Sequence, residues 1–177
     1  MQKVVTINGV DYRSADDGVT HINIYSKGAT TLGRFLSNFT RCDTLTNHGR
    51  FRSLEGYYHY LRAVVSVGDG MQDKLDLSRL EDLRLADGNF AQSLGRWVRT
   101  DLQKSGLRYI DLNDVFFGHF RDALLAKVVN SDYANEFAES TLPLTHYYVI
   151  KKGMIYHHPR FDWLSNMLED IRDELVS

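Results

Sequence analysis

The chain has 177 residues, 43% of them hydrophobic and 25% charged, which is typical of one globular domain, expected here over residues 1–177. Its net charge of −2 argues against a broad footprint on duplex phosphates and leaves open only a local contact with single-stranded DNA. No apolar run approaches the roughly 20 residues that cross a bilayer, which excludes a membrane-spanning protein. One cysteine and the lack of a secretory signal pattern favour a cytoplasmic location.

The first 33 residues predict a hairpin followed by a strand, both within the same domain. Apolar alternation over 4–12 surrounds Asn8-Gly9, a dipeptide that tolerates the positive φ of a tight hairpin turn. Residues 21–26 also alternate, as a half-buried strand does. The glycines that follow indicate a loop that leads into residues 36–39.

The middle of the chain predicts three helices after a turn at residues 47–49. Ser53 is a suitable N-cap for a helix of about three turns that ends near Val65. A second helix is expected over 77–86. A short third helix, capped by Asn89, is expected to run through Leu94 and to stop at Gly95, because glycine commonly follows a helix end.

The last third predicts more helix and one hairpin. The expected elements are helices over 113–129, 132–139 and 162–175, the last N-capped by Asp162, and a hairpin of 144–150 with 154–156 around a turn at 151–153. Strands first, then helices, then strands again indicate a compact, helix-rich α+β domain with short antiparallel strands.

Common metal and cofactor chemistries receive no support from the sequence. The histidine pairs 48/59 and 157/158 lack cysteine or carboxylate partners at metal-binding spacing. Cys42 lies in a polar stretch and is expected to be a free structural thiol. No glycine-rich phosphate loop occurs. We therefore expect neither a metal nor a cofactor.

The helix that starts after Ser53 carries the main candidate site. Glu55, His59 and Arg62 recur at one-turn spacing and share a face. They form either a solvated ladder of charges or a carboxylate, an imidazole and a guanidinium that face one ligand. Tyr57 and Tyr58 likewise either pack in the core or stack on a base.

Short motifs spread over residues 34–175 resemble the NADAR (YbiA-like) family. They are Ser37-Asn38-Phe39, Ser53-x-Glu55-x-Tyr57, Leu94-Gly95-Arg96, R-D-A-L-L-A-K over 121–127, and Trp163-Leu164 with the residues of the last helix. The resemblance implies a helix-rich domain that acts on ADP-ribose and related ribosyl compounds. Activities in that family include hydrolysis of N-glycosidic bonds in riboflavin-pathway intermediates and removal of ADP-ribose from guanine in DNA.

The resemblance assigns roles to particular residues. Asn38 matches a polar ligand-binding position, and Glu55 matches the catalytic carboxylate, which would stabilise positive charge on the sugar or activate water. Arg62 and Arg96 would hold phosphates or the departing base. The other assigned residues are Asp162 as a second carboxylate, Phe39, Tyr57 and Tyr58 as stacking rings, and Ser37, His59 and Trp163 as further ligand contacts.

Two departures from the family pattern keep two functions open. Lysine usually stands where this chain has Arg62, and a guanidinium cannot replace an amine that attacks the sugar. Asparagine usually stands where Asp162 is. The chain is therefore either a divergent N-glycosidic hydrolase or a non-catalytic protein that binds ADP-ribose or a nucleotide and sequesters it, for example in phage defence or counter-defence. The expected partner is an ADP-ribose-containing small molecule or an ADP-ribosylated nucleobase.

Overall fold

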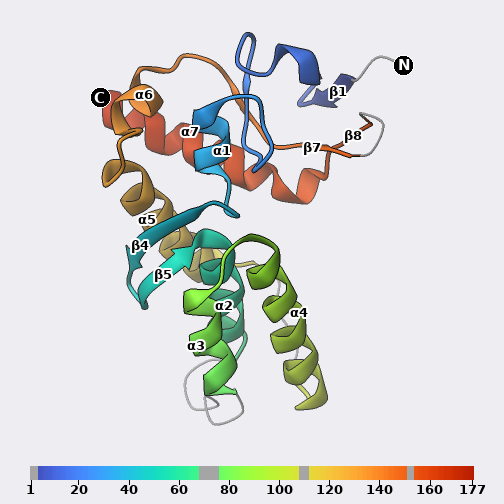
Figure 1. The fold of residues 1–177 in the computed structure, drawn as a ribbon, viewed down its shortest axis with the longest axis vertical. Helices are drawn as coiled ribbons and strands as arrows, with labels where there is room; N and C mark the ends of the chain where they lie inside the picture. The colour runs from blue at the N-terminus through green and yellow to red at the C-terminus, as the bar shows by residue number, and fades with distance from the viewer. Residues whose placement is uncertain (1–3, 68–75, 108–111, 151–153) are drawn as a thin grey trace. The chain divides into compact units, whose positions relative to one another are not determined.

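The computed structural model describes residues 4–67, 76–107, 112–150 and 154–177 (Figure 1). It confirms the α+β class, rich in helices and with short strand pairs. Within this fold the chain forms two compact units, Met1–Ser37 with Asn130–Ser177, and Asn38–Val129. The expectation of one domain over 1–177 stays a prediction. None of the described helices combines the length and the apolarity needed to cross a membrane.

The first unit joins the two ends of the chain. Ile22 and Asn23 pair in parallel with Leu144 and Thr145, more than a hundred residues later in sequence. The sequence placed residues 144–150 in one hairpin strand, but only Tyr148–Val149 pairs with Ile155–Tyr156, and the expected turn at 151–153 lies outside the described residues. The elements are β1 (Val4–Ile7), β2 (Val10–Arg13), a 3₁₀ turn (Ser14–Asp16), β3 (Ile22–Asn23), α1 (Thr31–Leu36), α6 (Ala134–Glu139), β6 (Leu144–Thr145), β7 (Tyr148–Val149), β8 (Ile155–Tyr156), a 3₁₀ turn (Pro159–Phe161) and α7 (Asp162–Val176).

The predicted first hairpin is confirmed, whereas the predicted glycine loop is partly wrong. Asn8 and Gly9 both have positive φ, 50° and 81°, as the turn between β1 and β2 requires. Residues 31–36 form α1 instead of a loop. Thr30 caps this helix by accepting a hydrogen bond from the Gly33 N–H at 2.9 Å. Position 33 of α1 accommodates only glycine, because a Cβ there would overlap the Asn23 carbonyl oxygen.

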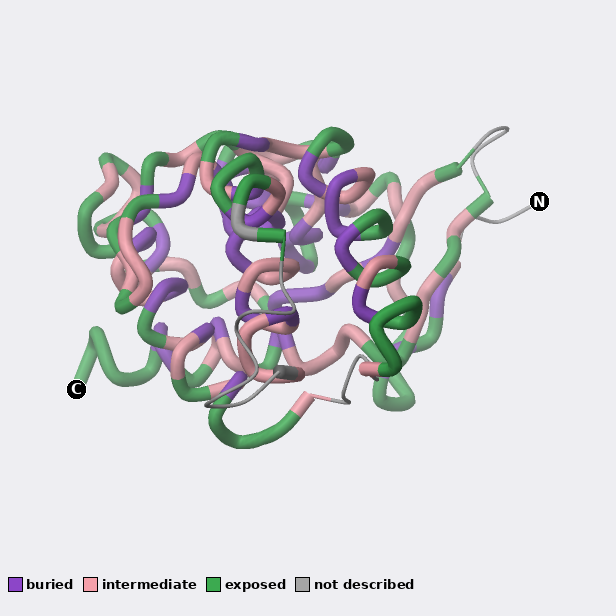
Figure 2. Tube along the Cα trace, turned by 90° about the horizontal axis from the view of Figure 1, so that it is seen from below, coloured by how far each residue is buried: buried purple, intermediate pink, exposed green. Residues whose placement is uncertain are grey.

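The second unit carries most of the candidate site. In Figure 1 its helices α2, α3 and α4 run side by side next to the β4–β5 hairpin, whose turn was predicted and whose strands were not. The elements are β4 (Arg41–Thr46), β5 (Gly49–Ser53), α2 (Leu54–Val67), α3 (Leu77–Leu85), α4 (Gly88–Lys104) and α5 (Asp114–Val129). Buried and exposed residues alternate along these helices (Figure 2), because each packs one side against its neighbours.

Lys127, on α5, is buried to 2% exposure, and this burial lowers its pKa to about 8. Between pH 8 and 10.5 the folded protein has lost this proton while the unfolded chain retains it. The unfolded state then binds more protons, so this lysine makes stability rise with pH.

We expect the unfolding free energy of the wild type, relative to Lys127→Met, to rise on the order of 2 kcal/mol from about pH 8 to about pH 10. Urea denaturation across that range measures it, since other titrating groups cancel between the two proteins. Lys27→Met, at an exposed position, serves as the control. A pH-independent difference for Lys127→Met would contradict the buried position.

Candidate functional site

Asn38 and Glu55, which the sequence assigned to one ligand site, are joined by a backbone contact at the start of α2. The Asn38 carbonyl oxygen accepts a hydrogen bond from the Glu55 N–H at 2.9 Å. Ser53 Oγ, the predicted N-cap, accepts from the Gly56 N–H at 3.1 Å and donates to the Ala86 carbonyl at 2.8 Å. Two of the otherwise unpaired N–H groups at this helix start are thereby satisfied, and the Asn38 backbone is fixed beside Glu55.

The Glu55 residue is largely buried, at 8% exposure, and its carboxylate pairs with His59 one turn later. The distance from His59 Nε2 to Glu55 Oε1 is 3.2 Å. A carboxylate in the first turn of a helix is stabilised by the helix dipole. An adjacent imidazole is able to donate a hydrogen bond to the carboxylate or to exchange a proton with it. The arrangement therefore supplies a fixed carboxylate and a proton-transfer partner at one place.

Gly95 brings α4 against this pair, whereas the sequence predicted that it ends a helix. The helix begins at Gly88, without a side-chain cap from Asn89, and continues to Lys104. A Cβ at position 95 would overlap the His59 ring. Glycine is therefore required here for a close approach of α4 to α2, which is the physical reason why the predicted helix end was wrong.

The side chain of Asn38 supplies an acceptor without a partner. Its Oδ1 is buried, and no hydrogen-bond donor for it occurs in the part of the chain that the structure describes. A buried acceptor left unpaired costs free energy on the order of 1–3 kcal/mol, which a ligand hydroxyl or amide would recover. Phe39, the next residue, lies against Gly88 at the start of α4, where a Cβ would meet the Phe39 ring at 3.6 Å.

The two tyrosines after Glu55 differ in position. Tyr57 is fully buried between the rings of Phe51 and Phe120, and burial raises its pKa to about 12. This favours the packing role for Tyr57. Tyr58 is only half-buried, and its Oη accepts a hydrogen bond from Arg62 Nη1 at 3.0 Å. The structure therefore gives Arg62 a partner, Tyr58, that the shared helical face of Glu55, His59 and Arg62 did not indicate.

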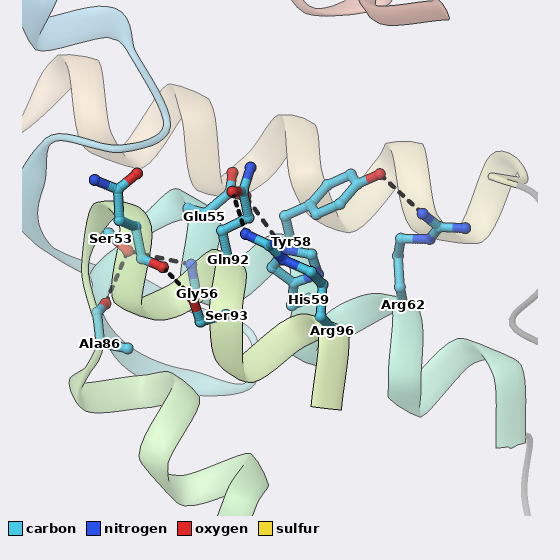
Figure 3. A network of polar contacts seen from close by, with 11 residues as sticks. Ser53, Glu55, Gly56, Tyr58, His59, Arg62, Ala86, Gln92, Ser93 and Arg96 are labelled. Carbon is cyan, nitrogen blue, oxygen red and sulfur yellow. Dashed lines mark hydrogen bonds and ion pairs between the residues drawn. The ribbon is translucent and has the colours of Figure 1, made fainter. Parts of the chain in front are cut away.

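Arg96 is exposed and donates to Gln92 Oε1 at 2.8 Å. Figure 3 shows the side chains of Gln92 and Arg96 grouped with those of Glu55 and His59, while Arg62 reaches toward Tyr58. Gln92 was not predicted from the sequence. Its spacing of four residues before Arg96 is the signal that would have indicated it, had the helix been continued through Gly95.

Three predicted site residues belong to the first unit. Ser37 follows the last residue of α1, and Trp163 lies in the first turn of α7. The N-cap of α7 is Phe161 and Asp162 is the first residue of the helix, so the predicted N-cap is wrong. The Asp162 carboxylate contacts His157 Nε2 at 2.6 Å, a partner that the sequence did not indicate. Roles for these residues alongside Glu55 stay predictions.

Over the described ranges, no three histidine, cysteine or carboxylate side chains lie together as a metal site would require. No family model, curated protein or solved structure matches the chain. The resemblance to NADAR therefore stays a prediction from the quoted motifs.

Proposed function

We propose that the protein is a divergent N-glycosidic hydrolase that releases ADP-ribose, or a related ribosyl group, from a nucleobase. The observation that carries the proposal is the junction of Asn38 with Glu55. Glu55, at the start of α2, supplies a buried carboxylate. Asn38, in the loop that contacts it, supplies the backbone bond to Glu55 and an unpaired buried amide oxygen. The NADAR resemblance names the same two positions.

The chemistry of the reaction suits this arrangement. Breaking the bond between ribose C1 and a base nitrogen leaves positive charge on the sugar and the bonding electron pair on the base. The Glu55 carboxylate would stabilise that cation or deprotonate the attacking water. His59, 3.2 Å from Glu55, would accept a proton from the carboxyl group or return one to it. Asn38 Oδ1 would accept a hydrogen bond from a ribose hydroxyl.

The two arginines suit binding rather than proton transfer. A guanidinium stays protonated and binds phosphate oxygens in a bidentate way. Arg96 is exposed and linked only to a neutral glutamine among the described residues, so its charge is available to a diphosphate. Arg62, held by Tyr58, would bind the ligand or the departing base but would not form a covalent adduct with the sugar.

The proposal is tested by separate incubations of the protein with NAD and with single-stranded DNA that carries ADP-ribosylated guanine, followed by mass spectrometry. Release of ADP-ribose together with the intact base is the expected result. Calorimetric titration with free ADP-ribose measures binding in parallel. Binding without any product would favour the sequestering protein, which Arg62 in place of lysine also favours. Absence of both would contradict the two functions.

A further inference from the structure

Two consecutive tyrosines of the first unit are each hydrogen-bonded to a histidine. The Tyr147 hydroxyl lies 2.7 Å from His21 Nε2, and both of these residues are fully buried. The Tyr148 hydroxyl lies 3.0 Å from His146 Nε2, and both of these residues are only half-buried. The first pair is enclosed in the core, whereas the second lies where a substrate is able to reach it.

A backbone carbonyl fixes the tautomer of the His146 imidazole. His146 Nδ1 lies 2.6 Å from the Ile24 carbonyl oxygen, and because a carbonyl only accepts hydrogen bonds, Nδ1 carries a proton. In the neutral imidazole the lone pair is then on Nε2, which accepts a hydrogen bond from the Tyr148 hydroxyl. An acceptor, an imidazole and a hydroxyl in this order are the arrangement in which a histidine acts as general base for a nucleophile.

Buried hydrogen bonds from β3 and the residue after it hold the segment that carries the half-buried pair. The Ile24 N–H donates to the Thr145 carbonyl at 2.7 Å. The buried Asn23 amide binds both the N–H and the carbonyl of Tyr147, each at 3.0 Å. His146 stands between these two anchored residues. Its imidazole is therefore held by a fixed backbone, as a base that must stay aligned with its nucleophile requires.

Three further aromatic rings border the half-buried pair. The ring centroids of Tyr25 and Tyr156 lie 5.5 and 6.3 Å from that of Tyr148, and the Phe161 centroid lies 6.2 Å from that of His146. In the described part of the chain these three bordering rings make no cation–π contact. Phosphoryl transfer requires cations around the transferred group, whereas an aromatic ester is neutral and packs on aromatic rings. The surroundings therefore favour an ester.

We propose that Tyr148 is a nucleophile that accepts acyl groups from neutral aromatic esters, with His146 as its general base. The Tyr148 oxygen bonds to the ester carbonyl carbon while its proton passes to His146 Nε2. The bond from that carbon to the aryl oxygen breaks, and the aryl oxygen takes the proton from Nε2 and leaves as a phenol. Water then hydrolyses the acyl-tyrosine to a carboxylic acid and restores Tyr148. Glu55 has no part in these steps, so the proposal does not rest on the proposed function.

The test uses the full chain and p-nitrophenyl acetate, with peptide mass spectrometry to locate the acetyl group and absorbance to follow the nitrophenol released. We expect acetylation of Tyr148 ahead of every other tyrosine. Tyr156 is the matched control within the wild type, because it is 50% exposed and has no hydrogen bond to an imidazole among the described residues. If exposure alone decided reactivity, Tyr156 would be acetylated first. The buried Tyr147 should remain unmodified.

His146→Asn distinguishes a general base from a structural partner. Its amide keeps an N–H group for the Ile24 carbonyl but has no basic nitrogen, so the rate of Tyr148 acetylation should fall about a hundredfold. The wild-type rate should fall in acid, as the imidazole is protonated, and level off above that range. The variant's rate should instead keep rising with hydroxide concentration. His119→Asn, at a half-buried histidine of α5, is the control and should react as the wild type does.

Three results would overturn the proposal. The first is acetylation of Tyr156 ahead of Tyr148 in the wild type, a comparison that needs no variant to fold. The second is a His146→Asn protein with the wild-type rate and pH dependence. The third is an undiminished release of nitrophenol by Tyr148→Phe, which would show that another group accepts the acetyl.

Discussion

Glu55→Gln is expected to lower the turnover of the ribosyl substrate by about a hundredfold or more, while the protein still folds. The amide keeps the shape of the side chain and a hydrogen bond to His59, but it carries no charge to stabilise a sugar cation and does not deprotonate water. A loss of this size corresponds to about 2.7 kcal/mol of transition-state stabilisation. Single-turnover release of ADP-ribose by the variant measures it, with ADP-ribose affinity measured separately to distinguish binding from chemistry.

Glu81→Gln is the matched control for that experiment. Glu81 is an exposed glutamate of α3 whose carboxylate pairs with Arg84 at 2.9 Å. Its removal should leave turnover unchanged, because surface ion pairs contribute little. Turnover of Glu55→Gln within about threefold of the wild type would exclude Glu55 as the principal catalytic group. The site would then have to be sought elsewhere.

The largest loss of stability is expected from Gly56→Ala, next to the catalytic candidate. A Cβ there would overlap the Leu83 carbonyl oxygen and lie 3.3 Å from that of Ala86. Both are backbone atoms at the end of α3, so the clash is relieved only by moving one helix away from the other. We expect the unfolding free energy to fall by about 3 kcal/mol, at the upper end of overpacking costs. Urea denaturation measures the loss.

Two other helical glycines give a graded comparison. A Cβ at Gly118, on α5, would meet no atom of another element within 4 Å among the described residues, so Gly118→Ala should raise stability by up to about 1 kcal/mol through helix propensity alone. In Gly95→Ala the new Cβ would meet the His59 side chain, which is able to rotate. We therefore expect its change in unfolding free energy to lie between those of Gly56→Ala and Gly118→Ala. Equal effects at all three positions would contradict the packing of α3 and α4 on α2.

Local patterns predicted the elements that depend on neighbouring residues. The Asn8-Gly9 turn, the Ser53 cap and the helices α3, α5 and α7 follow from φ preferences, capping side chains and apolar spacing within a few residues. The elements that differ from the prediction depend on distant partners. The helical Gly95 is explained by His59. The predicted strand over 21–26 is present but shorter, at Ile22–Asn23, where it pairs with Leu144 and Thr145. In each case the two contacting segments lie far apart in the sequence, so no short stretch of residues contains both.

The candidate site likewise has features that the local sequence predicted and features that only the packing of distant residues determined. From the sequence alone came the Asn38 and Glu55 positions, the one-turn spacing of Glu55 and His59, and the absence of a glycine-rich phosphate loop. Tertiary structure decided that the Asn38 carbonyl binds the Glu55 N–H, that Tyr57 packs in the core and that α4 meets His59 through Gly95. Helical spacing fixes which residues share a turn, but only the packing of separate helices fixes which faces meet, because burial is settled among all elements together.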